Sequence, residues 1–277
     1  MRPLTEPPRS VRPLLFRAPV LAIGLLCSAC AAVNPSPATP AEPAQLSAEL
    51  EQLANRARGL ESVQSPAIME YTSGTQRVKA REQLIAQLPA SLRVDALSPL
   101  GVALVVVAHD GTLQIFDPAK NQVIRDRATA ATLNRYVRIP MEPADAVRLL
   151  MGLAPAAAQL DRPADSVTSS GSMTVASWRA GGAGTAQLGF EDGALTMVRE
   201  LASGGAGAYD VRYSDYRDIG GINFPFVVEA DFPSAGSHLT LRYDRPIING
   251  SIPPSAFVLG PRISSELSSR SAEVRVG

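Results

Sequence analysis

The residue of this chain best placed to carry chemistry is Cys30, because of what precedes it. Residues 2–17 hold four arginines and one acidic residue, residues 18–26 form a short apolar run, and Ser28 and Ala29 are small. This order is typical of a secretory signal. The apolar run is too short to span a bilayer, which needs about 20 residues. Small residues directly before a cysteine are typical of a lipoprotein signal, which is cut before a cysteine that carries a diacylglycerol.

We therefore predict a signal peptide over residues 1–29 and lipidation of Cys30. The position three before the cysteine, usually leucine, is Cys27 here, and Leu26 lies one place further out. An ordinary cleaved signal with an incidental cysteine remains the alternative. Several acyl chains give stable anchoring, and Ala31 stands where an aspartate would favour retention in the inner membrane. The predicted location is the periplasmic face of the outer membrane.

Charge and cysteine content exclude two classes of protein. Without residues 1–29, Lys plus Arg falls from 26 to 22 and Asp plus Glu from 26 to 25, which leaves a net charge of −3. Nucleic-acid binding needs clustered basic charge, so a slightly acidic chain argues against it. A processed chain would keep Cys30 as its single cysteine, so we expect no disulfide within it.

The groups that enzymes use are scarce. His109 and His238 lie in separate predicted strands without neighbouring metal ligands, and no hydrolase, zinc-protease or P-loop motif occurs. Residues 181–184 are glycine-rich but open no helix, so they do not predict a phosphate site. Trp178 is predicted in the core, and the acidic pair at 191–192 precedes a turn glycine. We predict no catalysis, no cofactor and no metal.

The chain divides into four parts. After the signal, residues 30–43 are proline-rich and predict a lipidated, extended tether. Residues 44–262 are long enough for one domain with a large core. Residues 263–277 are polar and predict a flexible tail. We expect a monomer.

Within the domain, apolar residues recur with a period of two, which is typical of antiparallel strands with one apolar and one polar face. The clearest runs are Val78, Ala80, Leu84, Ala86 and Leu88; Leu92, Val94 and Ala96; Tyr209, Val211 and Tyr213; Phe226, Val228, Ala230 and Phe232; and Leu239, Leu241 and Tyr243. Turn signals occur at Asp110-Gly111, Asp192-Gly193, Gly220-Gly221 and Asn249-Gly250. The pattern predicts a mainly β fold of roughly a dozen strands, an incomplete antiparallel half-barrel.

Helices are few. Gln45–Gly59 carries an apolar stripe and ends at a glycine, and Pro143–Leu153 carries a second stripe after a proline. The second helix lies between strand blocks, so we expect two or three helices to cap the half-barrel. Short helices cannot fill an open sheet of this size, which predicts a cavity. Its predicted lining residues are Leu84, Leu92, Val94, Leu104, Val106, Val147, Leu150, Met151, Val211, Phe226, Val228, Leu239 and Leu241.

The order of these segments carries a resemblance. The resemblance rests on these segments: the loop 97–101, the strand 102–109, the hairpin 110–111, the strand 113–117, residues 121–124 and the helix 143–153 that leads into Pro155. Together they resemble the LolA/LolB family of lipoprotein-localisation proteins, over about residues 45–260. Residues 218–225 and 252–259 look more like uncharacterised relatives in that family.

The resemblance implies an incomplete barrel whose cavity takes acyl chains. It also implies an outer-membrane receptor that accepts lipoproteins from a soluble LolA-like carrier and inserts them into the outer membrane without nucleotide or metal. In such a receptor a loop leucine enters the lipid, and the matching residues are Pro99, Leu100 and Gly101. An ordinary turn with Leu100 in the core is the alternative.

The predicted function is therefore binding of lipid acyl chains or lipoproteins and their delivery to the outer membrane. Two other readings stay open. One is a periplasmic module of the same fold that binds or senses lipids or lipoproteins. The other is a structural outer-membrane lipoprotein with a filled core. A cavity of roughly 300 Å³ or more would be expected for a ligand.

Overall fold

The computed structural model describes residues 43–259, except residues 100, 157, 180–183 and 203–206. The predicted signal peptide, the tether up to residue 42 and the tail lie outside the described residues. The elements, in chain order, are α1 (Pro43–Gly59), β1 (Ser62–Ser73), β2 (Gln76–Gln87), β3 (Ser91–Ser98), β4 (Gly101–His109), β5 (Thr112–Asp117), β6 (Gln122–Arg127), α2 (Ala130–Val137), α3 (Pro143–Leu150), β7 (Ser166–Ser170), β8 (Met173–Arg179), β9 (Thr185–Glu191), β10 (Ala194–Leu201), β11 (Gly207–Ile219), β12 (Ile222–Phe232), the 3-10 helix η1 (Pro233–Ala235), β13 (Ser237–Tyr243), β14 (Ile247–Ile248) and the 3-10 helix η2 (Pro254–Phe257).

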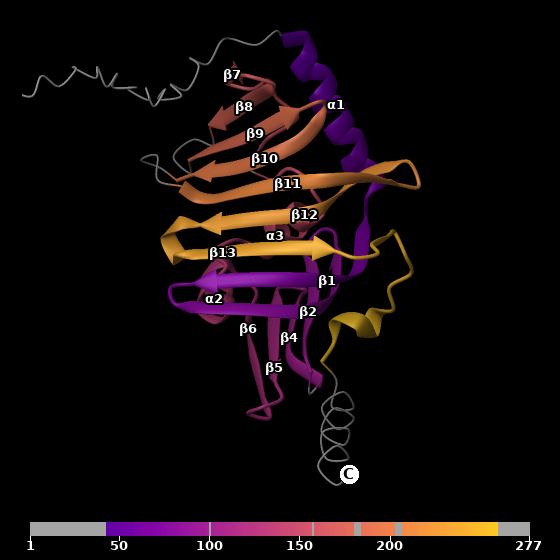
Figure 1. Cartoon of the computed structure of the whole chain (residues 1–277), viewed down its shortest axis with the longest axis vertical. Helices are drawn as coiled ribbons and strands as arrows, with labels where there is room; N and C mark the ends of the chain where they lie inside the picture. Colours follow the sequence, from indigo (N-terminus) through magenta and orange to yellow (C-terminus); the bar gives the residue numbers. More distant parts are fainter. Residues whose placement is uncertain (1–42, 100, 157, 180–183, 203–206, 260–277) are drawn as a thin grey trace, which may run out of the picture. The chain divides into compact units, whose positions relative to one another are not determined.

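The strands of the described chain form one antiparallel sheet of 14 strands (Figure 1). Their order is β6-β5-β4-β3-β2-β1-β13-β12-β11-β10-β9-β8-β7, with β14 paired to β1. Pairing of β1 with β13, for example Met69 opposite Leu241, joins the two halves of the chain. The edge strands β6 and β7 do not pair with each other, so the sheet stays open. The predicted fold class, mainly β with an incomplete antiparallel sheet and a few helices, is confirmed.

Tight turns join most neighbouring strands, as the sequence predicts. Asp110 and Gly111 have φ values of 45° and 70°, and Asp192 and Gly193 have 50° and 77°. Two successive positive φ values define the turn that matches the twist of a hairpin, and Asp-Gly tolerates them. Asn249 differs, because it follows β14 and joins no hairpin. Its side-chain oxygen accepts from the backbone N–H groups of residues 61 and 62, and so fixes the step from α1 to β1.

The helices agree with the prediction in part. The helix predicted over Gln45–Gly59 is α1. The helix predicted over Pro143–Leu153 ends earlier, at Leu150, because Gly152 takes a left-handed φ of 66°. The sequence did not predict α2, whose only local signal is a capping box between Thr129 and Thr132.

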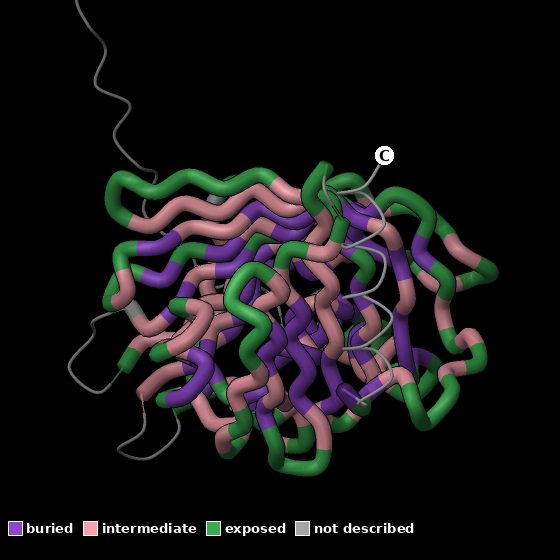
Figure 2. Tube along the Cα trace, turned by 90° about the horizontal axis from the view of Figure 1, so that it is seen from below, coloured by how far each residue is buried: buried purple, intermediate pink, exposed green. Residues whose placement is uncertain are grey.

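The sheet has two different faces. The inner face carries the large hydrophobic cluster, to which α1 and α3 contribute. The other face carries a small outer cluster of Val105, Val107, Phe116, Phe257 and Leu259. In Figure 2 buried positions run along the strands, and exposed positions gather at the turns.

Strand β2 departs from its predicted apolar stripe. Glu82 lies on the inner face between Ala80 and Leu84, and only 2% of it is exposed. Val78, on the same face, is 48% exposed because it lies near the β1–β2 turn at the end of both strands. The stripe therefore holds only in the second half of the strand, where it includes a carboxyl group.

Candidate functional site

The residues predicted to line a cavity come together in the inner-face cluster. Leu84, Leu92, Val106, Val147, Met151, Val211, Phe226, Val228 and Leu241 are buried, and Val94, Leu104, Leu150 and Leu239 are half-buried and pack against them. They come from two groups of three neighbouring strands, β2–β4 and β11–β13, which lie on either side of β1, and from α3 with its first following residue. The period-two pattern thus correctly placed these residues on one face of the sheet, but it did not predict which segment covers that face.

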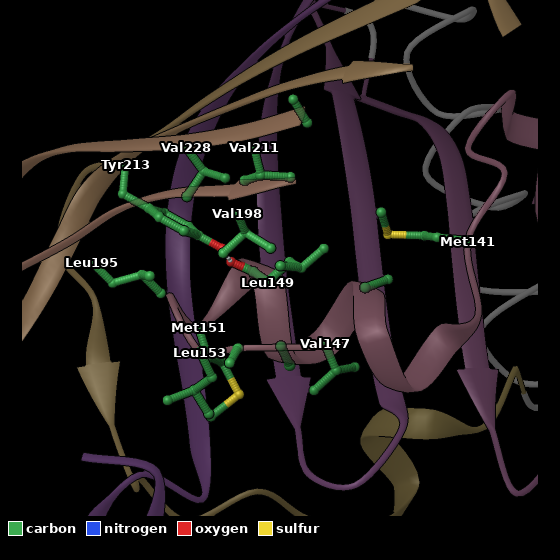
Figure 3. Close-up of a cluster of buried hydrophobic side chains, with 14 of the residues drawn as sticks. Met141, Val147, Leu149, Met151, Leu153, Leu195, Val198, Val211, Tyr213 and Val228 are labelled. Carbon is green, nitrogen blue, oxygen red and sulfur yellow. Dashed lines mark hydrogen bonds between the residues drawn. The ribbon is translucent and has the colours of Figure 1, made fainter. Parts of the chain in front are cut away.

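Helix α3 covers this face. It packs against β3 and β2, and Val147 and Met151 are both fully buried. Figure 3 shows Leu149 of α3 beside Val198 and the Tyr213 hydroxyl on the sheet. Alanines on β1 and β2, such as Ala67 and Ala86, leave room for a helix to approach the strands closely.

The space over the sheet is packed in this structure, which differs from the half-empty barrel that the sequence predicted. The reason is the non-helical chain around α3. Met141 before it and Leu153, Ala154 and Ala158 after it are all buried in the same cluster. Two short helices alone would leave a gap, but helix and connecting chain together fill it. Access to the buried members of the predicted lining therefore requires that α3 move.

The C-terminal end of α3 is held by hydrogen bonds from two directions. The backbone N–H groups of Gly152 and Leu153 donate to the carbonyls of Leu149 and Arg148, at 3.0 and 2.8 Å. This is the arrangement that commonly ends a helix at a left-handed glycine. From the sheet, the Tyr213 hydroxyl donates to the carbonyl of Leu149 at 3.0 Å (Figure 3). The Tyr243 hydroxyl donates to the carbonyl of Leu150 at 2.7 Å.

Both tyrosines stay neutral donors at physiological pH. Burial raises the pKa of Tyr213 well above its ordinary value. Burial, and then the nearby carboxyl of Glu82, raise the pKa of Tyr243. The two residues are 3% and 5% exposed, so their hydroxyls lie in an apolar environment. Each hydroxyl therefore needs an acceptor, and α3 supplies it.

Glu82 is a buried acidic residue on the same face of the sheet as the two tyrosines. Ala67 on β1 pairs with Glu82 on one side and with Tyr243 on the other, so the three residues form a row across the sheet. Burial raises the pKa of Glu82 from 4.5 to about 7. Its Oε1 atom has no hydrogen-bond partner. A carboxyl group in this position is protonated for a large fraction of molecules near neutral pH.

A pocket of about 330 Å³ opens beside the inner-face cluster, between α1, the β9–β10 turn and the β11–β12 turn. None of the predicted cavity residues lines it. Its apolar lining comes from Leu53, Phe190, Leu195 and Ile222, and its polar lining includes Gln52, Asn55 and Arg56. Leu53, Phe190 and Leu195 also belong to the inner-face cluster. The pocket thus reaches the core at the end of α1.

The predicted membrane-insertion loop joins β3 to β4. Pro99 and Gly101 are exposed, and Ser98 donates to the carbonyl of Gly101 at 3.0 Å. Gly101 has a φ of 114°, which glycine adopts readily. Leu100 lies outside the described residues, as does Cys30, so both assignments stay predictions.

The histidines have structural partners. His109 contacts Ser91 through Nδ1 at 2.8 Å and stacks on Phe257, with ring centres 5.1 Å apart. His238 contacts Asp231 at 2.7 Å. Trp178 is fully buried, as predicted for a core residue. Over the described residues, no group of His, Cys, Asp and Glu is arranged to hold a metal ion, and no helix is long and apolar enough to cross a membrane.

Sequence reasoning missed the polar members of the site. Tyr213 and Tyr243 stood in predicted apolar faces, but their hydroxyls were given no role. The apolar residues around Glu82 predict a stripe, and the stripe gives no sign of the carboxyl group within it. The position of Glu82, an even number of residues from Leu84 and Ala86, was the signal that could have found it.

No family model matches this chain, and no curated protein matches it. Similar solved structures include a DUF1329 family protein from Desulfovibrio piger, with a TM-score of 0.51 and 10% identity, over 78% of this chain and 98% of that one. They also include a LolA superfamily protein from Nitrosomonas europaea, with a TM-score of 0.49 and 13% identity, over 76% and 96% of the two chains. At these identities the likeness concerns the fold alone.

Proposed function

We propose that this chain binds acyl chains of lipids or lipoproteins on the inner face of its sheet, with α3 moving aside to admit them. The observation that carries the proposal is the continuous apolar surface beneath a helix of only 8 residues. Such a cover is short compared with the sheet. The pocket beside α1 offers a point of entry to the same cluster.

The free energy that holds α3 on the sheet and the free energy of binding an acyl chain are similar in size. Burial of an acyl chain stabilises a complex by roughly 0.8 kcal/mol per CH₂, so a chain of about fourteen methylenes gives roughly 11 kcal/mol. Lifting α3 exposes the side chains of Val147, Leu149 and Met151, at about 1.5–3 kcal/mol each, and breaks its hydrogen bonds to the sheet. A ligand that replaces α3 therefore binds reversibly. Reversible binding is what a protein needs if it is to pass cargo to a membrane.

The wider proposal is an outer-membrane lipoprotein, anchored through Cys30, that takes cargo from a LolA-like carrier and delivers it to the membrane by binding rather than catalysis. The basic, apolar and small residues before Cys30 support the anchor. The exposed Pro99 and Gly101 support a projecting loop. Metabolic labelling with radioactive palmitate tests the anchor: the wild-type chain should carry label, and Cys30→Ala should carry none.

The binding proposal is tested by native mass spectrometry of the full chain purified from cells, and by its ability to enhance diphenylhexatriene fluorescence. Val94→Glu places a carboxylate on the inner face beneath α3. Val102→Glu is the matched control, because Val102 is also half-buried but packs against the outer cluster. We expect Val94→Glu to lose co-purified lipid and fluorescence, whereas Val102→Glu keeps both at a comparable loss of thermal stability.

A structural lipoprotein with a filled core is the second candidate, and one observation favours it: most of the inner-face residues are buried as the protein stands. That candidate predicts no co-purified lipid and no fluorescence enhancement in the wild-type chain. It also predicts that the two valine variants differ only in stability. Either result would remove the acyl-binding proposal.

A further inference from the structure

Two buried hydroxyl groups on the inner face use the backbone of α3 as their acceptor. Tyr213 on β11 donates to the carbonyl of Leu149, and Tyr243 on β13 donates to the carbonyl of Leu150, at 3.0 and 2.7 Å. Leu149 and Leu150 are the last two residues of α3. The tyrosines come from different strands, with β12 between them, yet both hydroxyls meet adjacent carbonyls.

These hydroxyls constrain whatever replaces α3. Both tyrosines are buried among apolar side chains, and burial keeps both neutral. A buried donor that loses its acceptor is costly, because it is shielded from water and has no new partner. A plain hydrocarbon tail would fill the apolar space but would leave both donors unpaired. A ligand that carries carbonyl oxygens at the same place would restore both bonds.

We propose that the inner-face site selects lipids by their acyl carbonyl groups, and takes neutral acyl esters or amides in preference to hydrocarbon or ether chains. The inference rests on the proposed acyl-chain function and names its ligand class. The ligand's carbonyl oxygen takes the position that the carbonyls of Leu149 and Leu150 hold in the closed protein. Glu82, in the same row as Tyr243, disfavours a ligand carboxylate there, because two neighbouring carboxyl groups cannot both ionise without a cost.

The test compares two probes that differ only in the carbonyl group. Methyl hexadecanoate and hexadecyl methyl ether each displace diphenylhexatriene from the full chain, and the ratio of their dissociation constants is measured. We expect the wild-type chain to bind the ester at least about fivefold more tightly, the net value of one hydrogen bond. In Tyr213→Phe and Tyr243→Phe this preference should fall, and in the double variant the ratio should approach one.

The ratio separates carbonyl recognition from loosening of α3. Each variant also frees α3 from one bond, which strengthens binding of both probes equally and cancels in the ratio. Tyr216→Phe is the matched control, because Tyr216 lies on the same strand as Tyr213 but donates to the carbonyl of Leu195 on β10. It should keep the wild-type ratio.

The outcomes distinguish failure of acyl-chain binding from failure of carbonyl recognition. A wild-type chain that binds neither diphenylhexatriene nor the probes removes the proposed function, and the inference with it. A chain that binds both probes with a ratio of one overturns the carbonyl inference and leaves acyl binding intact. A Tyr216→Phe variant that loses the ester preference as strongly as Tyr213→Phe would also overturn it, because the effect would then come from general loosening.

Discussion

The two faces of the sheet are both covered by a short helical segment, but the covers are attached differently. On the outer face, η2 places Phe257 in a small apolar cluster, where the ring stacks on His109. Arg93 donates to the carbonyl of Ala256 at 2.9 Å and ties that cover to β3. On the inner face, α3 covers a much larger cluster and is tied by tyrosine hydroxyls to its last carbonyls.

The difference lies in what would remain if each cover left. Removing η2 would expose a small apolar patch together with the Ser91 hydroxyl, which is bound to His109, and the Arg93–Asp95 ion pair, so the polar groups there would keep partners on the sheet. Removing α3 would expose a broad apolar surface with two hydroxyl donors and a carboxyl group arranged on it. A surface whose polar groups lose their partners can select a ligand, whereas a small patch whose polar groups stay paired on the sheet can only be refilled by its own cover. We therefore interpret the outer cover as structural and the inner cover as exchangeable.

The largest expected effect is on stability, from truncation of the outer cover. Phe257 is 2% exposed, and Phe257→Ala should destabilise the chain by about 3–5 kcal/mol because it removes a buried ring and leaves a cavity. Urea unfolding measures the loss. Under conditions where the variant is folded, its affinity for diphenylhexatriene should equal that of the wild-type chain. A large change in that affinity would show that the two faces are coupled.

The corresponding truncation in the inner cover should behave differently. Met151 is fully buried, and Met151→Ala should cost about 2–5 kcal/mol of stability. The same change weakens the closed state that a ligand must displace, so affinity for diphenylhexatriene should rise, by at most about tenfold for each 1.4 kcal/mol of closure lost. Unchanged affinity in this variant would mean that α3 does not move on binding.

The period-two pattern was sufficient to predict the fold class, because one face of most strands is buried and the other is exposed. Asp110-Gly111 and Asp192-Gly193 located hairpins because few other pairs accept two positive φ values. Helix α1 was predicted because its apolar stripe and terminal glycine are both local signals. These features depend on residues that are close together in the sequence, so local sequence patterns predict them directly.

What the sequence could not supply depends on contacts between distant segments. The packing of Leu153 and Ala158 over the sheet follows from the path of a connection that has no period of its own. Helix α2 lacks a long apolar stripe, and only Thr129 and Thr132 mark its start. The pairing of Tyr213 and Tyr243 with consecutive carbonyls needs the end of α3 to meet residues of β11 and β13, which no local pattern encodes.

The smallest expected effect is the dependence of stability on pH. It separates the two faces of the sheet, because the titrating group, Glu82, lies on the inner face. Burial raises the pKa of Glu82 from 4.5 in an exposed chain to about 7 in the folded one. Between these values the folded protein binds more protons than the unfolded one, so the free energy of unfolding falls as pH rises. The loss should begin near pH 4.5, be complete slightly above pH 7, and amount to at most about 3 kcal/mol.

Glu82→Gln should abolish this slope, match the wild-type stability near pH 4.5, and exceed it at pH 8. Urea unfolding at several pH values measures both chains. Equal slopes in the two chains would show that Glu82 is solvated, and that the inner cover is already partly open in the unliganded protein.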